Sequence, residues 1–179
     1  MDSNQKDSIR KKVATLLRRH GVTSAPVPVE RIAGLKAQIR YSRLDDKLSG
    51  MVYVKDGTAI IGVNALHHPN RQRFTIAHEL GHLILHKPMI TKEIHVDKKF
   101  PMLMRAPTSS AKMNQTEVEA NYFAAEILMP VSFLIRSLKE EPFIINDIDI
   151  DDDIVASTLA KKYEVSVSAM RFRLSNLFA

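Results

Sequence analysis

The sequence contains no cysteine among its 179 residues. This absence excludes disulfide bonds, thiolate zinc sites, iron–sulfur clusters and a cysteine nucleophile, so any metal ion must be held by histidine and carboxylate side chains. No apolar run approaches the roughly 18 residues that a membrane span requires. The opening segment, MDSNQKDSIRKK, also lacks the apolar core of a signal peptide. We therefore expect a cytoplasmic protein with no membrane partner.

Composition and charge indicate a soluble globular chain. Hydrophobic residues make up 45% and charged residues 26% of the sequence, which is close to the average for such proteins. The net charge of +6 is unevenly distributed, because residues 1–43 are strongly basic whereas residues 139–160 hold seven acids against one lysine. A basic segment could meet nucleic acid or an acidic partner, but charges on the outer face of an amphipathic helix are most often simply solvated.

Hydrophobic periodicity predicts an α+β fold. Segments at 39–43, 50–54 and 58–63 alternate as β-strands do, and they predict a small antiparallel sheet of three to four strands, the fourth at 93–97. The turn signal Lys55-Asp56-Gly57 separates the second and third strands. Residues 98–113 show no sustained period and predict a long loop. Helical spacing predicts helices over residues 8–20, 29–35, 71–86, 114–129, 131–138, 158–163 and 168–177.

The expected organisation is one domain with a small appendage. We expect residues 1–140 to form a minimal domain in which the sheet packs against the helix at 71–86 and further helices. Residues 141–179 then form an acidic connection, with the acidic run at 147–153, and a C-terminal helix-turn-helix-like pair packed on that domain.

An H-E-x-x-H motif, His78-Glu79-Leu80-Gly81-His82, lies inside the helix predicted at 71–86. Histidines four residues apart share one helical face, so both imidazoles can reach a single ion. Glu79 lies about 100° around the helix from His78, where it can hold a water molecule beside the ion rather than bind the ion itself. The motif predicts a metal site. The alternative interpretation is a pair of partly buried histidines that are hydrogen-bonded near the core.

A catalytic zinc ion needs a third protein ligand and one position for water. His86 lies about 12 Å along the helix axis from His78, too far for the three histidines to share one ion, and we expect it to cap the negative end of its helix. Candidates for the third ligand must therefore be sought further along the chain, and the helix at 114–129 offers three. Its carboxylates are Glu117, Glu119 and Glu126.

Helix geometry favours Glu117 among these three carboxylates. Asn121 lies one turn from Glu117 on the same face, so it can orient a ligating imidazole from behind while Glu117 binds the ion. Glu119 points about 200° away from Glu117, and it remains a weaker alternative together with Glu126.

Several segments of the chain form a recognisable combination. They are HELGHLILH, EIHVD, the R-x-P-x-S-S stretch from Arg105 to Ser110, and EVEANYFAAEILMP. The combination of H-E-x-x-H with E-x-x-A-N-x-F-A-A-x-x-x-M-P resembles the ImmA/IrrE family of zinc metallopeptidases. The flanking segments PVPVERIA and LAKKYEVSVSAMRFRL are also similar to that family, so the resemblance covers nearly the whole chain.

The resemblance implies a gluzincin-like site with one zinc ion, or another divalent ion such as Mn²⁺ in the cell. It implies His78, His82 and Glu117 as the ligands and Glu79 as the catalytic acid/base. It also implies a zinc-dependent endopeptidase that hydrolyses a peptide bond in a regulatory protein, a helix-turn-helix repressor or antitoxin encoded nearby. Family members that carry their own N-terminal DNA-binding domain differ from this chain, whose residues 1–43 are too short for one.

Amide hydrolysis also needs a hydrogen-bond donor for the oxyanion. The sequence offers three candidates without choosing among them, namely Tyr122, His95 and Arg105.

Two other classes of function compete with hydrolysis. In the first, the chain is a non-hydrolytic, zinc-stabilised module that inactivates a partner repressor by contact. In the second, the basic N-terminal helix and the C-terminal pair bind DNA through Arg171 and Arg173. The acidic run directly before that pair opposes contact with phosphate, so direct DNA binding is not expected.

Overall fold

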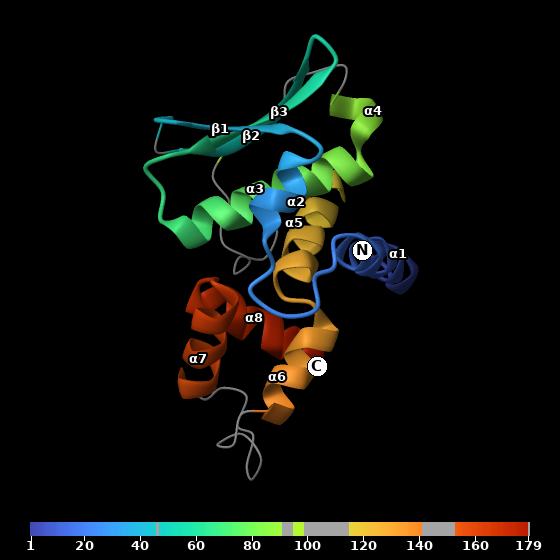
Figure 1. Ribbon diagram of the computed structural model, residues 1–179, viewed down its shortest axis with the longest axis vertical. Coiled ribbons are helices and arrows are strands. Elements are labelled where there is room, and N and C mark those ends of the chain that lie inside the picture. The colour runs from blue at the N-terminus through green and yellow to red at the C-terminus, as the bar shows by residue number, and fades with distance from the viewer. Residues whose placement is uncertain (46, 91–94, 99–114, 141–152, 179) are drawn as a thin grey trace.

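The computed structural model describes residues 1–45, 47–90, 95–98, 115–140 and 153–178. The small sheet lies at one end of the molecule, and the helices extend from one of its faces toward the C-terminal helix pair at the other end (Figure 1). The expected α+β class is confirmed. The elements are α1 Ser3–Arg19, α2 Val29–Gly34, β1 Gln38–Ser42, β2 Leu48–Lys55, β3 Thr58–Asn64, α3 Pro69–Leu85, α4 Lys87–Ile90, β4 His95–Lys98, α5 Gln115–Leu128, α6 Val131–Glu140, α7 Asp153–Tyr163 and α8 Val167–Phe178.

Among the described residues, the sheet has four strands in the order β1-β3-β2-β4. Strands β2 and β3 form the predicted hairpin, and both Asp56 (φ 49°) and Gly57 (φ 76°) take the left-handed backbone that a tight hairpin turn requires. The fourth strand is confirmed as β4, which pairs antiparallel with β2. The expectation of a wholly antiparallel sheet is wrong, however, because β1 runs parallel to β3.

The parallel pairing arises from the connection between β1 and β2, which passes the end of β3 instead of turning back as a hairpin. Asn64, the last residue of β3, is completely buried. Its amide nitrogen donates to the carbonyl oxygens of Leu48 (2.9 Å) and Asp45 (3.3 Å). These bonds fix the connecting segment across the end of β3, so β2 starts on the opposite side of β3 from β1.

Helix α3 lies against β2 and β3 and presents a fully buried stripe toward the core. It begins at Pro69 because His68 caps it through Nδ1 and proline is well suited to the first helical position. It ends at Leu85, one residue before the predicted end at residue 86. Pro88 lies in the next short helix, α4.

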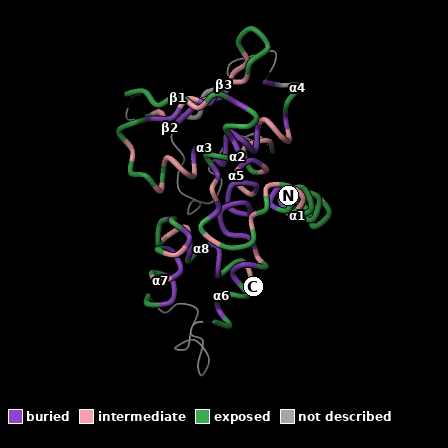
Figure 2. Tube along the Cα trace, in the orientation of Figure 1, coloured by how far each residue is buried: buried purple, intermediate pink, exposed green. Residues whose placement is uncertain are grey.

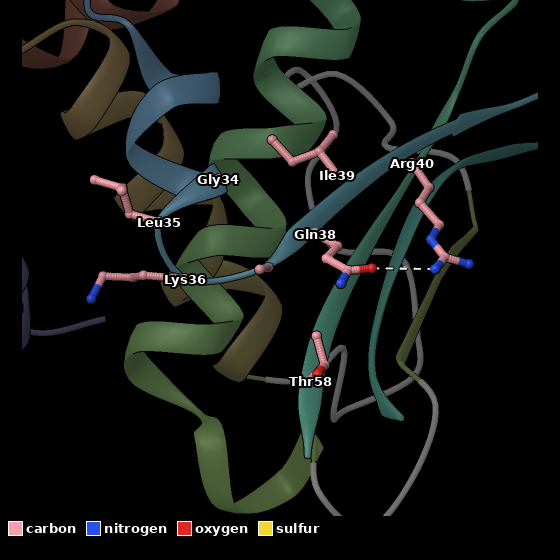
Figure 3. Close-up of a pocket in the computed structure, with 8 residues that line it drawn as sticks. Gly34, Leu35, Lys36, Gln38, Ile39, Arg40 and Thr58 are labelled. Carbon is pink, nitrogen blue, oxygen red and sulfur yellow. Dashed lines mark hydrogen bonds between the residues drawn. The ribbon is translucent and has the colours of Figure 1, made fainter. Parts of the chain in front are cut away.

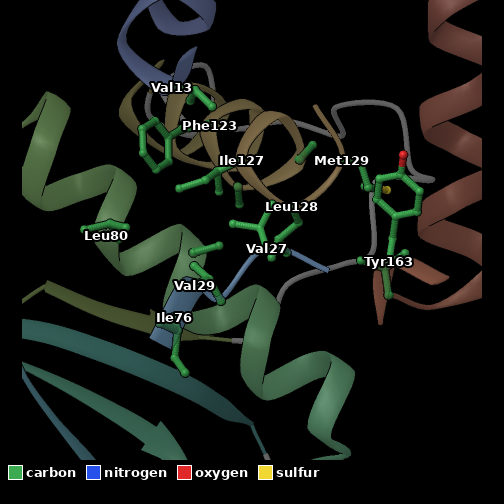
Figure 4. Close-up of a cluster of buried hydrophobic side chains, with 14 of the residues drawn as sticks. Val13, Val27, Val29, Ile76, Leu80, Phe123, Ile127, Leu128, Met129 and Tyr163 are labelled. Atoms are coloured by element: carbon green, nitrogen blue, oxygen red, sulfur yellow. The ribbon is translucent and has the colours of Figure 1, made fainter. Parts of the chain in front are cut away.

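The core forms where α1, α3 and α5 meet. Figure 4 shows Val13, Leu80, Phe123 and Ile127 in one cluster, and all four side chains are at most 1% exposed. Buried positions follow α5 along most of its length (Figure 2). The predicted apolar stripe of α1 is confirmed, although the helix starts at Ser3, earlier than expected, because Asp2 caps it.

The C-terminal pair α7–α8 is confirmed and packs onto α5 and α6. Arg173 of α8 is only 5% exposed; its Nε donates to the Met129 carbonyl oxygen (3.1 Å), and its Nη2 lies 2.5 Å from Glu126 Oε2. Arg171 forms an ion pair with Asp153. The structure therefore argues against the alternative in which Arg173 contacts DNA, because its guanidinium points into the protein.

One helical stretch of the described residues, Gln115–Glu140, is long and apolar enough to span a membrane by length and composition. Within the fold, however, 61% of its apolar window is buried. The stretch consists of α5 and α6, and Pro130 stands between them. Its apolar character is accounted for by the core that it fills.

Candidate metal centre

Three side chains from two helices converge beneath the sheet. His78 and His82 lie one turn apart on α3, are 0% and 2% exposed, and hold their Nε2 atoms 2.9 Å apart. Glu117, in the first turn of α5, places Oε2 3.4 Å from His78 Nε2 and Oε1 3.3 Å from His82 Nε2. The ligand atoms all lie within 4.8 Å of one another, so this group could hold a metal ion.

The hydrogen bond behind His78 determines which ring nitrogen faces the group. His78 Nδ1 lies 3.2 Å from Asn121 Oδ1, and an amide oxygen can only accept a hydrogen bond. Nδ1 therefore carries the proton, and the Nε2 lone pair points toward His82 and Glu117. Imidazole nitrogen and carboxylate oxygen are ligands that zinc accepts. The donor set fits a divalent ion, and Asn121 lies where an orienting residue would be expected.

Small residues allow the two helices to approach each other at this point. A Cβ atom on Gly81 would lie 3.1 Å from Phe123 Cδ1 and 3.3 Å from both Cα and the carbonyl oxygen of Ala120. Gly81 lies between the two histidines of α3, and Ala120 lies one turn after Glu117. Close packing of Gly81 on Ala120 therefore brings Glu117 within reach of the imidazoles. This role of Gly81 was not predicted from the sequence, although a glycine inside a strong helix is the signal that could have revealed it.

Glu79 is completely buried beneath strand β2. A Cβ atom on Gly50 of β2 would lie 3.6 Å from Glu79 Oε1, 2.3 Å from Thr75 Cγ2 and 2.7 Å from the Gly62 carbonyl oxygen. The strand can pass this close to α3 only because residue 50 has no side chain. This close approach at Gly50 was not predicted from the sequence either, although an isolated glycine within a strand pattern is a signal for it.

His86 is the C-cap residue of α3, as expected, but its side chain contacts other residues of the site. Its Nδ1 lies 3.3 Å from His82 Nδ1, and its Nε2 lies 3.0 Å from Glu119 Oε2. Partial burial acts to raise the pKa of Glu119, but the hydrogen bonds from His86 and Gln115 and the nearby charge of Lys12 act to lower it and prevail. The pKa of Glu119 therefore lies below its usual value, and the residue is a carboxylate.

The two alternative carboxylates are engaged elsewhere. Glu119 bonds His86, and Glu126 is buried against Arg173, with Arg10 Nε 3.7 Å from its Oε2. Neither belongs to the metal-binding group.

Of the three oxyanion candidates, only Tyr122 has a side chain that the structure describes, and it is not part of the metal-binding group. The Tyr122 ring lies on the side of α5 that faces α1. The Cζ atom of Arg10 lies 5.9 Å from the centroid of this ring. Burial, together with the charge of Glu126, raises the pKa of Tyr122. His95 lies on β4, where only the backbone is described. The loop predicted at 98–113 lies outside the described residues from residue 99 onward, and Arg105 is in that part. Residues 147–152 of the acidic run also lie outside the described residues.

A separate depression of about 590 Å³ lies where α2 runs into β1 (Figure 3). Gln38 and Arg40 of β1 line it and are joined by a hydrogen bond of 3.2 Å, and Lys36 and Leu35 stand at its other side. None of its lining residues is a histidine or a carboxylate, and it shares no residue with the metal-binding group. The acid–base and metal chemistry therefore belongs to the α3–α5 group.

Comparison with known proteins supports the assignment to a family. No curated protein matches the chain. Among solved structures, a Mycobacterium tuberculosis transcriptional regulator has the same fold with a TM-score of 0.59 and 15% sequence identity, and the match covers 92% of this chain and 45% of that one. The chain thus spans less than half the length of that regulator. The family model described as the IrrE N-terminal-like domain, Peptidase_M78, matches residues 33–175. The chain therefore belongs to the IrrE-like Peptidase_M78 family.

Proposed function

We propose that the chain is a cytoplasmic zinc-dependent endopeptidase that cleaves a regulatory protein. The observation that carries this proposal is the convergence of His78 Nε2, His82 Nε2 and the Glu117 carboxylate within 4.8 Å. Membership of a peptidase family supports the same chemistry. Three protein ligands would leave one position of a tetrahedral ion for water or substrate, which is the arrangement of catalytic rather than structural zinc.

The chemistry divides between the ion and Glu79. Zinc, when bound, polarises a peptide carbonyl and makes a water molecule acidic near neutral pH. Glu79 takes one proton from the attacking water molecule while the oxygen of that water bonds to the carbonyl carbon. Glu79 then gives that proton to the amide nitrogen as the carbon–nitrogen bond breaks. Burial under β2 keeps bulk water from competing for this carboxylate.

The proposed substrate is a helix-turn-helix repressor or antitoxin encoded close to this chain. The fold is shared with a transcriptional regulator, which agrees with a role in regulation. Arg173 is buried and Arg171 is paired with Asp153, so the C-terminal pair is better suited to supporting the fold or contacting a protein than to binding DNA.

Replacement of Glu79 by glutamine tests the proposal against the non-hydrolytic alternative. The variant should still bind one equivalent of zinc and still bind the partner, but cleavage of the neighbouring repressor, followed by mass spectrometry, should fall by about 10²- to 10⁴-fold. His82→Ala should lose the metal as well. The matched control is Glu140→Gln on α6, whose side chain is 58% exposed and only weakly paired, and it should cleave normally.

Two results would refute the proposal. If Glu79→Gln inactivates the repressor as well as the unmodified chain does, the protein acts by contact. If His82→Ala retains a full equivalent of zinc, the ligand set is wrong.

A further inference from the structure

The third histidine of α3 extends the metal-binding group outward. His86 follows His82 by one turn, is 8% exposed, and lies with its ring centroid 5.4 Å from that of His82. Beyond it, Glu119 accepts from His86 at Oε2 (3.0 Å) and from the Gln115 side-chain amide at Oε1 (2.9 Å). A continuous line of polar contacts therefore runs from a carboxylate on α5 to a histidine of the candidate metal centre.

Glu119 stands at the outer end of this line, and it determines which atom donates in each hydrogen bond. A carboxylate only accepts, so His86 Nε2 must carry a proton and donate it to Glu119. In the neutral ring Nδ1 is then an acceptor, and the contact of 3.3 Å with His82 Nδ1 requires His82 to donate. The remaining nitrogen of His82, Nε2, is left with its lone pair directed at His78 and Glu117.

The two imidazoles of the centre have different outer partners. His78 is oriented by the neutral amide of Asn121, whereas the line behind His82 ends in a charged carboxylate. A negative charge behind an imidazole makes its free nitrogen a better ligand, and histidines that bind metals commonly have such a partner. Here a second imidazole, that of His86, lies between the carboxylate and His82.

We propose that His86 and Glu119 are positioning residues for His82, and that together they fix its tautomer and strengthen its bond to a divalent cation. The inference rests on the proposed metal site but not on hydrolysis. The contact of His86 with the end of α3 that the structure describes is made by its backbone, whose N–H donates to the His82 carbonyl oxygen at 2.8 Å. The side chain, directed at His82 and Glu119, is explained by the positioning role.

The test measures metal affinity of the full chain with Zn²⁺ alone, by competition with a chromophoric chelator. His86→Phe and Glu119→Ala should each weaken binding by about 10- to 100-fold. Glu119→Gln should weaken it less, because its amide oxygen still accepts from His86. The double variant His86→Phe/Glu119→Ala should bind about as weakly as His86→Phe, because Glu119 acts through His86. Glu140→Ala removes an exposed carboxylate and should leave affinity unchanged.

A second readout separates positioning from folding. With Co²⁺ in place of zinc, the visible absorption of the metal should change in His86→Phe and Glu119→Ala, while thermal unfolding of the metal-free proteins should stay close to that of the unmodified chain. Affinities of both single variants within about twofold of the unmodified chain, or fully additive losses in the double variant, would overturn the inference. A chain that binds zinc tightly with the predicted variant pattern but cleaves nothing would refute the peptidase proposal alone.

Discussion

Gly81 of α3 faces Ala120 of α5 so closely that a Cβ atom on Gly81 would lie 3.3 Å from both the Cα atom and the carbonyl oxygen of Ala120. These neighbours are backbone atoms of a buried helix, so they cannot rotate away as a flexible side chain would. The spacing of α3 and α5 at this contact therefore determines how far Glu117 lies from His78 and His82. A glycine within the H-E-x-x-H motif contributes to the metal site without a functional group of its own.

Gly81→Ala should weaken zinc binding more than it changes stability. Alanine favours a helix by about 1 kcal/mol over glycine, which offsets the cost of moving α5 by a few tenths of an ångström. Nothing compensates for the effect of the displaced Glu117 on zinc affinity. We therefore expect the zinc Kd to rise about tenfold, comparable to the loss of a supporting residue. Chelator competition and urea unfolding of the same samples measure the two effects.

The matched control for this prediction is Gly34→Ala in α2, because a Cβ atom there meets nothing within 4 Å. It should leave zinc binding unchanged. Equal zinc affinities for Gly81→Ala and Gly34→Ala would show that the α3–α5 contact does not set the position of Glu117.

Gly50→Ala should destabilise the fold by about 1–3 kcal/mol, the usual range for overpacking. Its Cβ atom would lie 2.3 Å from Thr75 Cγ2 and 2.7 Å from the Gly62 carbonyl oxygen. Thr75→Ser removes Cγ2 but leaves the backbone oxygen, so the double variant Gly50→Ala/Thr75→Ser should recover only part of the loss. Urea denaturation of the two single variants and the double variant gives the coupling energy, and purely additive effects would contradict the predicted clash.

Local sequence pattern predicted the parts of the site that lie on single helices. His78 and His82 share a face because they are four residues apart in one helix, and Glu117 shares a face with Asn121 for the same reason. The apolar residues of α1 and the hairpin turn at Asp56-Gly57 were predictable in the same way. Each of these features depends on neighbours within about one turn.

Features that depend on distant pairing were not predictable. The parallel partner of β1 is set by the buried amide of Asn64, which holds a connection about 20 residues earlier in the chain. His86 and Glu119 are 33 residues apart, and helix geometry alone could show only that Glu119 points away from Glu117. Periodicity identifies the face that a helix buries, but not the side chain that it meets there.

Arg173→Met should destabilise the protein by about 3 kcal/mol, because it leaves the buried carboxylate of Glu126 without its closest charge partner. Arg10 Nε remains 3.7 Å from that carboxylate, but its side chain is 43% exposed and compensates only in part. Adding Glu126→Gln removes the buried charge and should restore much of the loss. Urea unfolding measures these differences.

The control is Arg171→Met, which removes a guanidinium from an exposed pair with Asp153 and should cost less than about 1 kcal/mol. Similar losses for Arg171→Met and Arg173→Met would mean that burial of the Arg173 pair contributes little to the attachment of the C-terminal helices.

Tyr163→Phe should make stability less sensitive to alkaline pH. Burial raises the pKa of the Tyr163 phenol above its ordinary value of 10.0, despite the hydrogen bond with Ser137 (3.0 Å) and the nearby charge of Arg136. Above pH 10 the unfolded chain therefore loses this proton while the folded protein keeps it, so the free energy of unfolding falls as pH rises toward the folded-state pKa. At pH 7 the variant should be less stable by about 1 kcal/mol, since it lacks the hydrogen bond. The difference in unfolding free energy between the two proteins should then narrow from pH 9 to pH 11 in urea titrations.

The control is Tyr41→Phe, because Tyr41 is 46% exposed, and no change is expected for it. A difference for Tyr163→Phe that stays constant across this pH range would show that the buried phenol does not cause the loss of stability at alkaline pH.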